Sequence, residues 1–364
     1  MGEWINADEL QEVKGSMEYY AERHYGCRVT EYGWRGHRLV VLENEVLRVG
    51  VVATKGADIV ELRYKPPDVD FMWHSPHPLL PPAEYIPTSP APLGTFLDYY
   101  PGGWQESLPA GNGAPTLAGA PLGLHGEVAT MPWDVRVEHD EEERVAVCFS
   151  VRGRRTPFWL RRTMAVERGS AYVGLDETLV NEGEEELPFM WGHHIAFGPP
   201  FLAMGCTLEL PEDPVVVTEG MPHGRYRPGR YERWPLLRDR EGRVVDGALV
   251  PPRETRSQDT LYLVLSGPGR AAVRNPDLGI GVGVEWDAAV FPYVWSWQVY
   301  GGAWGYPYYG RTYHLAVEPF NAPIGSLEDA ERGGTARRLG PGEEITTRLR
   351  AGAIVGPRPF TGFA

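Results

Sequence analysis

Short apolar stretches, many of them alternating with polar residues, recur along the whole chain between Gly, Pro and Asn residues. Runs of this kind predict β-strands, because every second side chain of a strand faces the same side. Clear examples are residues 46–52, 59–64, 145–151, 172–180, 261–265, 281–286, 313–317 and 344–351. Helical spacing is confined to Ala7–Val13 and Ser326–Arg332. The pattern therefore predicts an all-β protein with very few helices, a sandwich or a barrel.

No fixed-period repeat is present in the 364 residues, which argues against a propeller. The proline-rich segments Pro66–Pro109 and Pro211–Pro252 are predicted to be long loops, and loops of such length in a compact domain usually carry function. No stretch has the composition of a linker that would divide the chain. We therefore expect a single domain over residues 1–364.

The charge of the chain restricts its partners. The formal net charge is −14, so nucleic acid is not expected to bind. No apolar run reaches the roughly 18–20 residues of a membrane helix, and the first ten residues are polar, so we expect a cytoplasmic protein without a membrane partner. Cys27, Cys148 and Cys206 lie far apart and are interpreted as buried thiols rather than a disulfide framework or a zinc site.

Glu318 is the first candidate for chemistry. It ends the apolar run Leu315-Ala-Val-Glu-Pro, where a carboxylate is costly to bury unless it is paired or used. Burial would raise its pKa toward neutrality, as a general base requires. The alternative is a solvent-facing Glu on an edge strand, since Pro319 cannot donate to a strand ladder.

Three histidines are candidates for the partner group. His193 and His194 follow Phe189-Met-Trp-Gly, and adjacent residues of a strand point to opposite faces, so one of the two is expected to enter a given cavity. A hydrogen-bonded core histidine is the alternative for either. His125 lies between Leu124 and Gly126, where glycine permits a close approach to a ligand but also marks ordinary turns.

Aromatic residues are abundant, with 12 Trp and 18 Tyr, and they cluster at residues 99–106, 291–300 and 304–309. Aromatic rings can pack on the C–H faces of a pyranose while polar neighbours bond its hydroxyls, although large β cores also use aromatics. The clusters lie in Gly/Pro-rich segments, which favours a ligand site. The predicted substrate-binding residues from these clusters are Trp104, Gln105, Glu106, Trp295 and Trp297.

Other chemistries have little support. His74 and His77 lack a third ligand nearby, so no metal is predicted. A dinucleotide fingerprint, a P-loop and a Gly-x-Ser-x-Gly elbow are absent from the sequence, and no cofactor is expected.

Three stretches together resemble the aldose 1-epimerase (galactose mutarotase) superfamily. Leu124-His125-Gly126 before Trp133 is similar to that family's Leu-His-Gly segment, His194-Ile-Ala-Phe197 to its His-x-x-Phe strand, and Val317-Glu318-Pro319 to its Glu-bearing strand. The resemblance implies a galactose mutarotase-like β-supersandwich with a core at residues 38–355 and an N-terminal extension at 1–30.

The resemblance also implies a reaction. A family member interconverts the α and β anomers of a sugar by general acid/base ring opening, with Glu318 as the base and protonated His194 as the acid. His125 would complete the catalytic set, and His193 would contact the sugar. Asp259 is the candidate for the family's sugar-binding Asp.

Departures from the family pattern place the chain in a divergent branch. Residues 192–198, Gly-His-His-Ile-Ala-Phe-Gly, stand where the mutarotases have Asn-His-x-Tyr-Phe-Asn, so the flanking Asn and Tyr are lost, and residues 291–297 replace the family's Pro-Gly-Leu-Gln-Tyr segment. We expect a small carbohydrate as the partner, and a monomer or homodimer. Alternatives are a catalytically silent carbohydrate-binding or sensor protein, a phosphosugar 1-epimerase using Arg161, Arg162 or Arg311, and a glycoside hydrolase or lyase.

Overall fold

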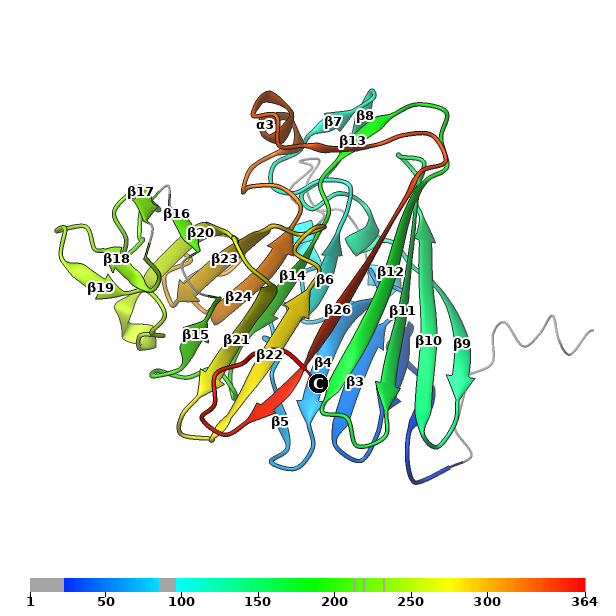
Figure 1. Cartoon of the computed structure of the whole chain (residues 1–364). Coiled ribbons are helices and arrows are strands. Elements are labelled where there is room, and N and C mark those ends of the chain that lie inside the picture. Colours follow the sequence, from blue (N-terminus) through cyan, green and yellow to red (C-terminus); the bar gives the residue numbers. More distant parts are fainter. Residues whose placement is uncertain (1–22, 85–95, 212–213, 219, 232, 364) are drawn as a thin grey trace, which may run out of the picture.

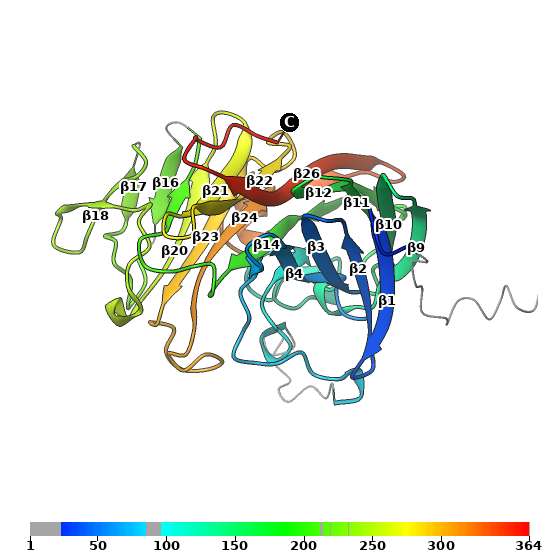
Figure 2. The ribbon, with the colours of Figure 1, turned by 90° about the horizontal axis from the view of Figure 1, so that it is seen from below.

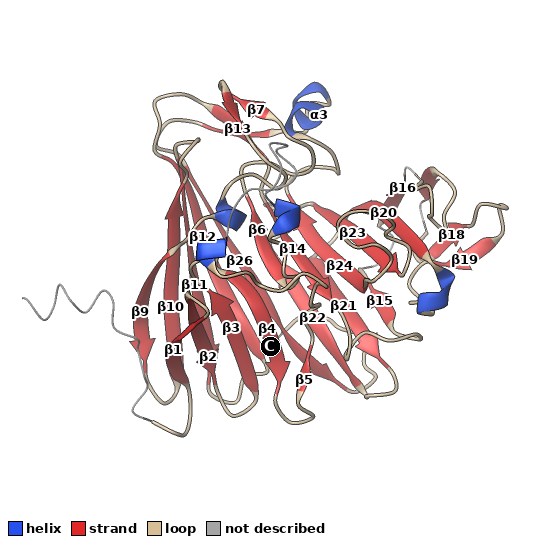
Figure 3. Cartoon of the chain, turned by 180° about the vertical axis from the view of Figure 1, so that it is seen from behind, coloured by secondary structure: helices blue, strands red, loops and turns tan. Residues whose placement is uncertain are grey.

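Two large antiparallel sheets lie face to face in the computed structural model, which describes residues 23–84, 96–211, 214–218, 220–231 and 233–363. Figure 1 shows the two layers from the side, and Figure 2 shows from below that the sheet with β12 and β26 lies over the sheet with β3 and β14. The all-β prediction is confirmed. Helices are short, as the few helical segments in Figure 3 show.

The larger sheet has 12 strands and carries the site described below. In spatial order its strands are β1 (Arg28–Trp34), β2 (His37–Glu43), β3 (Leu47–Val52), β4 (Asp58–Tyr64), β6 (Trp104–Ser107), β14 (Gly192–Phe197), β24 (Tyr313–Phe320), β23 (Tyr293–Tyr300), β20 (Ser257–Val264), β16 (Val215–Thr218) and β17 (Gly229–Tyr231), and β5 (Val69–Asp70) pairs with β4.

The second sheet has eight strands and covers one face of the first. Its order is β15 (Thr207–Glu209), β21 (Gly269–Asn275), β22 (Ile280–Trp286), β26 (Glu344–Val355), β12 (Tyr172–Asn181), β11 (Phe158–Glu167), β10 (Arg144–Arg152) and β9 (Asp134–Asp140). Three two-stranded pairs complete the fold: β7 (Thr116–Leu117) with β8 (Ala120–Pro121), β13 (Leu187–Phe189) with β25 (Arg337–Leu339), and β18 (Leu236–Arg238) with β19 (Val244–Asp246).

The hydrophobic core lies between the two sheets. Val49, Ile59, Trp104 and Ile195 of the larger sheet and Leu175 of the smaller one are fully buried in one contiguous cluster. Because side chains alternate along a strand, the residues between these core positions face the other side of the larger sheet, here called the outer face. The catalytic candidates fall on this outer face.

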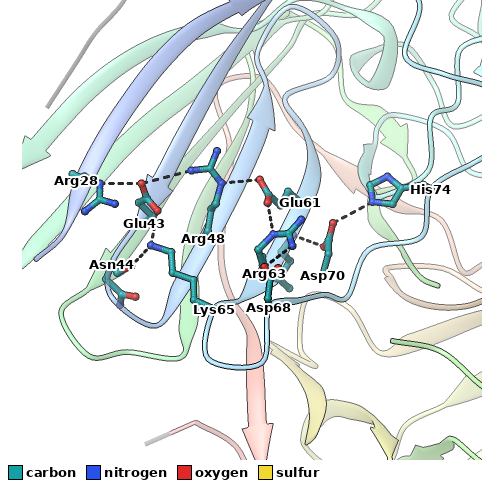
Figure 4. Close-up of polar contacts among 11 residues, drawn as sticks. Arg28, Glu43, Asn44, Arg48, Glu61, Arg63, Lys65, Asp68, Asp70 and His74 are labelled. Atoms are coloured by element: carbon teal, nitrogen blue, oxygen red, sulfur yellow. Dashed lines mark hydrogen bonds and ion pairs between the residues drawn. The ribbon is translucent and has the colours of Figure 1, made fainter. Parts of the chain in front are cut away.

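The beginning of the outer face, over β1 to β5, is covered by a ladder of ion pairs (Figure 4). Glu43 pairs with Arg28 at 2.9 Å, and Glu61 bonds Arg48 at 3.0 Å and Arg63 at 2.7 Å. Glu43 is buried, whereas the arginines that contact it and Glu61 are partly exposed. Pairs with an exposed member contribute little stability each, so the ladder mainly gives this part of the sheet a polar surface.

Two helical segments were predicted, and one of them lies within the described residues. The predicted helical turn at Ser326–Arg332 is confirmed as α3 (Leu327–Arg332), which begins with a capping box between Ser326 and Asp329. The predicted helix Ala7–Val13 lies outside the described residues. Further helical turns are η2 (Pro82–Glu84), η3 (Val128–Thr130) and η4 (Arg253–Thr255).

The two predicted loops contain short strands. Pro66–Pro109 includes β6, which lies in the middle of the larger sheet, and Pro211–Pro252 includes β16 to β19. A strand of four residues reading Trp-Gln-Glu-Ser has no apolar alternation, because both of its faces meet buried polar groups. The prediction of loops throughout these segments was therefore wrong.

Candidate active site

Strand register places the candidate groups in one row across the larger sheet. His194 of β14 pairs with Gln105 of β6, and Glu318 of β24 pairs with Trp295 of β23. The pairs Gly192–Phe320 and Ile195–Val317 set β14 against β24 so that His194 stands opposite Glu318. Residues that are opposite each other share a face, so all four lie on the outer face. His194 and Glu318, which are 124 positions apart in the sequence, are thereby brought together on adjacent strands.

A cavity of about 310 Å³ lies over this row. Its volume is at the lower end of the roughly 300–1,000 Å³ range of ligand pockets. Most of the wall is aromatic or aliphatic. The lining residues are Phe96, Leu97, Tyr100, Asn112, Leu124, His125, His194, Gln258, Thr260, Trp295, Trp297, Ala303, Trp304, Tyr306, Pro307, Tyr308, Glu318 and Ile324.

Glu318 and His194 form the centre of the cavity floor. Their Oε1 and Nε2 atoms are 3.8 Å apart, too far for a direct hydrogen bond, and both side chains are almost completely buried. Burial raises the pKa of Glu318 to about 8 and lowers that of His194 to about 4. Near neutral pH the pair therefore holds one proton, on the Glu318 carboxyl group, and both groups are uncharged.

The other ring nitrogen of His194 is held by Tyr100. The Tyr100 hydroxyl and His194 Nδ1 are joined by a hydrogen bond of 3.1 Å. Phe96 stacks on the Tyr100 ring with centroids 5.0 Å apart, and Trp73 packs against it at 5.4 Å. This packing fixes the hydroxyl beside Nδ1 and directs Nε2 toward Glu318. Burial raises the pKa of Tyr100 well above its usual value, so it stays a neutral phenol.

His125 reaches the same cavity from a strained turn. Its φ is +60°, and the φ of Gly126 is +79°; a Cβ at Gly126 would meet the Leu108 backbone at 2.1 Å. A non-glycine residue in this conformation costs of order 1–3 kcal/mol and is often found at functional sites. The His125 and His194 rings are 5.2 Å apart, and His125 Nδ1 has no hydrogen-bond partner among the described residues. Burial keeps the pKa of His125 well below its usual value, so the ring is neutral.

His193 points to the opposite side of β14, into the core. Its Nδ1 accepts a hydrogen bond from Trp104 Nε1 at 3.1 Å, and its Nε2 lies 3.2 Å from Glu177 Oε2. Glu106 lies 3.4 Å from the same ring and 3.3 Å from the Arg162 guanidinium. His193, Trp104 and Glu106 were predicted to bind the substrate, but the structure places them between the sheets, away from the cavity.

This buried cluster is the one group of potential metal ligands found among the described residues. One ligand atom from each of Glu106, Glu177 and His193 lies within 4.8 Å of the others. The Arg162 guanidinium already brings a positive charge to Glu106, and Trp191 Nε1 donates to the same carboxyl group. Those contacts satisfy Glu106 without a metal ion. The donor set therefore fits a buried ion-pair network better than a metal site.

Gln105 and Asp259 also lie outside the cavity. Gln105 is on the outer face, but its amide donates to Asp58 and to the Gly102 carbonyl beneath the floor. Asp259 of β20 faces the core side, where it accepts hydrogen bonds from Arg225 Nε at 2.9 Å and from the Arg225 backbone at 2.8 Å. Its neighbours Gln258 and Thr260 face the cavity instead, because alternate residues of β20 point to opposite sides.

Of the predicted site residues, the structure brings together His125, His194, Glu318, Trp295 and Trp297 in one cavity. Tyr100, Gln258 and Thr260 line it too and were not singled out from the sequence. Alternation along residues 257–264 could have indicated the last two, since they flank a buried Asp. The position of Tyr100 depends on its contact with a residue 94 positions away, which no local pattern reveals.

The family assignment comes from a sequence profile. The profile of the domain of unknown function DUF4432 matches residues 34–352. The chain belongs to this family. No curated protein sequence matches the chain.

Similar solved structures identify the fold of this chain. A protein from Klebsiella pneumoniae described as a "putative aldose 1-epimerase" is similar with a TM-score of 0.71 and 15% identity, over 90% of this chain and 83% of that one. A galactose mutarotase-like protein from Clostridium acetobutylicum has a TM-score of 0.57 at 14% identity, over 91% and 99% of the two chains. A galactose mutarotase related enzyme from Lactobacillus acidophilus has a TM-score of 0.56 at 17% identity, over 89% and 97%. The DUF4432 chain thus has the galactose mutarotase-like fold expected from its sequence.

In the part of the chain that the structure describes, the helices are too short or too polar to cross a bilayer.

Proposed function

We propose that this DUF4432 protein is an aldose 1-epimerase-like isomerase that interconverts the α and β anomers of a sugar. The observation that carries the proposal is the Glu318–His194 pair, whose Oε1 and Nε2 atoms lie 3.8 Å apart in a mostly aromatic cavity. Ring opening needs one proton removed from the anomeric hydroxyl and one delivered to the ring oxygen. Both oxygens are attached to the anomeric carbon, so one acid and one base side by side can serve both.

The proton of the free pair sits on Glu318, whereas the family resemblance implied an ionised Glu318 and a protonated His194. Burial without a compensating charge disfavours both ions, which is why the neutral arrangement is favoured. We therefore assign Glu318 as the first proton donor and His194 as the first acceptor. In the assignment that the family resemblance implied, the pair holds the same single proton, but on His194 instead of Glu318.

The steps balance in protons and electrons. His194 Nε2 takes the proton of the anomeric hydroxyl, the Glu318 carboxyl group protonates the ring oxygen, the C1–O5 bond breaks and a C1 carbonyl forms. Rotation about C1–C2 exposes the other face of that carbonyl. On closure the O5 hydroxyl returns its proton to Glu318 and His194 returns its proton to O1. His125, neutral and unpartnered at Nδ1, can bond a sugar hydroxyl.

The residues that line the cavity argue against two alternatives. No Arg or Lys lines it within the described ranges, so a sugar phosphate would meet no cation there. Glu318 is the one carboxyl group of that lining, whereas glycoside hydrolysis uses two carboxyl groups across the scissile bond. Isomerisation of an uncharged aldose is therefore the function that the lining supports best.

The test is NMR measurement of anomer exchange on a panel of free and phosphorylated aldoses. We expect the wild-type protein to accelerate exchange of at least one free aldose, and Glu318→Gln to lower the rate by about 10²–10⁴-fold while binding is retained. Glu344→Gln, at an exposed carboxyl group of β26 away from the cavity, is the matched control and should keep the wild-type rate. An unchanged rate in Glu318→Gln would contradict the assignment. Binding without acceleration of any sugar would instead indicate the carbohydrate-binding or sensor protein.

A further inference from the structure

The rim of the cavity carries two exposed aromatic residues that the proposed chemistry does not use. They belong to the loop at residues 301–312, between β23 and β24. Trp304 and Tyr306 line the cavity, yet their exposed fractions are 52% and 51%. By contrast, Trp295 and Tyr308 of the same cavity are buried. The aromatic surface therefore continues from the floor of the site out to solvent.

Both rim side chains are held in place. The Tyr306 hydroxyl donates a hydrogen bond to Asp98. The Arg256 guanidinium lies 5.9 Å from the centroid of the Trp304 ring, and a Cβ at Gly310 would lie 2.8 Å from the same ring. A surface that is already ordered loses little conformational freedom on binding. An exposed, ordered aromatic surface next to a ligand cavity is typical of a further binding site.

The chemistry of this surface matches a second sugar ring. An aromatic face packs on the C–H face of a pyranose, and the cavity of about 310 Å³ is lined by buried Trp295 as well as by exposed Trp304 and Tyr306. Gln258 and Asn112 also line the cavity and can bond the hydroxyls of a saccharide. We propose that Trp304 and Tyr306 form a subsite for the second ring of a di- or oligosaccharide whose reducing end lies between His194 and Glu318. This inference rests on the proposed function and names its substrate class.

The experiment compares monosaccharides with reducing disaccharides that end in the same sugar. The probes are glucose with maltose, cellobiose and lactose, galactose with β-1,4-galactobiose, and mannose with β-1,4-mannobiose. The dissociation constant is measured by titration, and anomer exchange is measured by NMR. For at least one pair, the wild-type protein should bind the disaccharide about tenfold more tightly, because its second ring would bury apolar surface against two aromatic side chains.

The variants Trp304→Ala and Tyr306→Ala should remove that preference and leave monosaccharide binding within about twofold of wild type. Two matched controls have exposed aromatics away from the cavity lining: Trp34→Ala on β1, with 44% of the side chain exposed, and Tyr309→Ala in the same loop, with 61% exposed. Neither should change the ratio of disaccharide to monosaccharide affinity.

Three results would overturn the subsite. The first is that no disaccharide binds better than its monosaccharide. The second is that Trp304→Ala weakens both equally. The third is that Trp304→Ala converts a dimer to a monomer on size exclusion, which would make the rim an interface between copies. Tighter disaccharide binding that depends on Trp304, without any anomer exchange, would support the subsite and refute the proposed catalysis.

Discussion

At the residue scale, the site depends on two side chains that burial makes neutral. Glu318 and His194 each lose solvation without gaining a charged partner close enough to compensate. The Glu318 carboxyl group therefore keeps its proton, and the His194 ring stays a neutral imidazole. A carboxylic acid beside a neutral imidazole can donate and accept a proton at the same time. The orientation of the imidazole then decides whether Nε2 meets the substrate, and Tyr100 controls that orientation.

Tyr100 is expected to act as a positioning residue. Tyr100→Phe keeps the ring that packs against Phe96 and Trp73 but removes the hydrogen bond to His194 Nδ1. We expect kcat to fall by about 3–10-fold with KM nearly unchanged, since one neutral hydrogen bond contributes about 0.5–1.5 kcal/mol. The ¹⁵N shifts of the His194 ring should move at the same time, which a purely structural role would not cause. Tyr308→Phe, at another buried tyrosine of the cavity, is the control; equal effects of the two variants would contradict the assignment.

At the scale of the element, the alternation of a strand separates residues that face the core side from residues that face the cavity. On β20, Gln258 and Thr260 face the cavity, while Asp259 faces the core side and bonds Arg225. On β14 the same rule sends His194 to the cavity and His193 to the buried network. Adjacent residues of similar polarity therefore face different surroundings, one the cavity and the other the core side.

Substitutions on β20 test this division. Asp259→Asn should lower the free energy of unfolding by about 1–3 kcal/mol, because Arg225 loses a charged partner, and should leave KM nearly unchanged. Gln258→Ala should raise KM at unchanged stability. Chemical denaturation and saturation kinetics measure the two quantities. A large KM effect from Asp259→Asn at normal stability would show that Asp259 reaches the sugar after all.

At the scale of the whole molecule, the two sheets enclose charged groups as well as apolar ones. Arg162 and Glu177 of the smaller sheet meet Glu106 and His193 of the larger one, and all four are buried. Burial raises the pKa of Glu106 and of Glu177 to about 7. The network joins the sheets directly behind His194, so its protonation affects the stability of the sandwich.

This network predicts a pH dependence of stability. A carboxyl group whose pKa is raised in the folded protein binds its proton more tightly when folded, so its contribution is present below its usual pKa and is lost as the pH rises toward about 7. Glu177→Gln does not titrate and keeps the neutral form. From about pH 5 to about pH 8, the variant should gain about 1–3 kcal/mol of unfolding free energy relative to wild type. Denaturation at both pH values measures the difference, with the exposed Glu344→Gln as control; a difference independent of pH would contradict the raised pKa.

The sequence by itself determined the β architecture, because apolar alternation is a local property of each strand, and the helical spacing at Ser326–Arg332 indicated α3 for the same reason. It also indicated His125, His194 and Glu318, since the motifs around them are contiguous. Short polar β6 was missed because its side chains are stabilised by partners from distant strands.

Only the tertiary structure decided which side each candidate faces and what its pKa is. The registers of β6, β14, β24 and β23 place His194 opposite Glu318 and send His193 and Asp259 to the other side. Desolvation then makes the acid and the imidazole neutral, and it depends on every segment that covers the cavity. Register and burial are properties of pairs of strands, and a linear pattern contains neither.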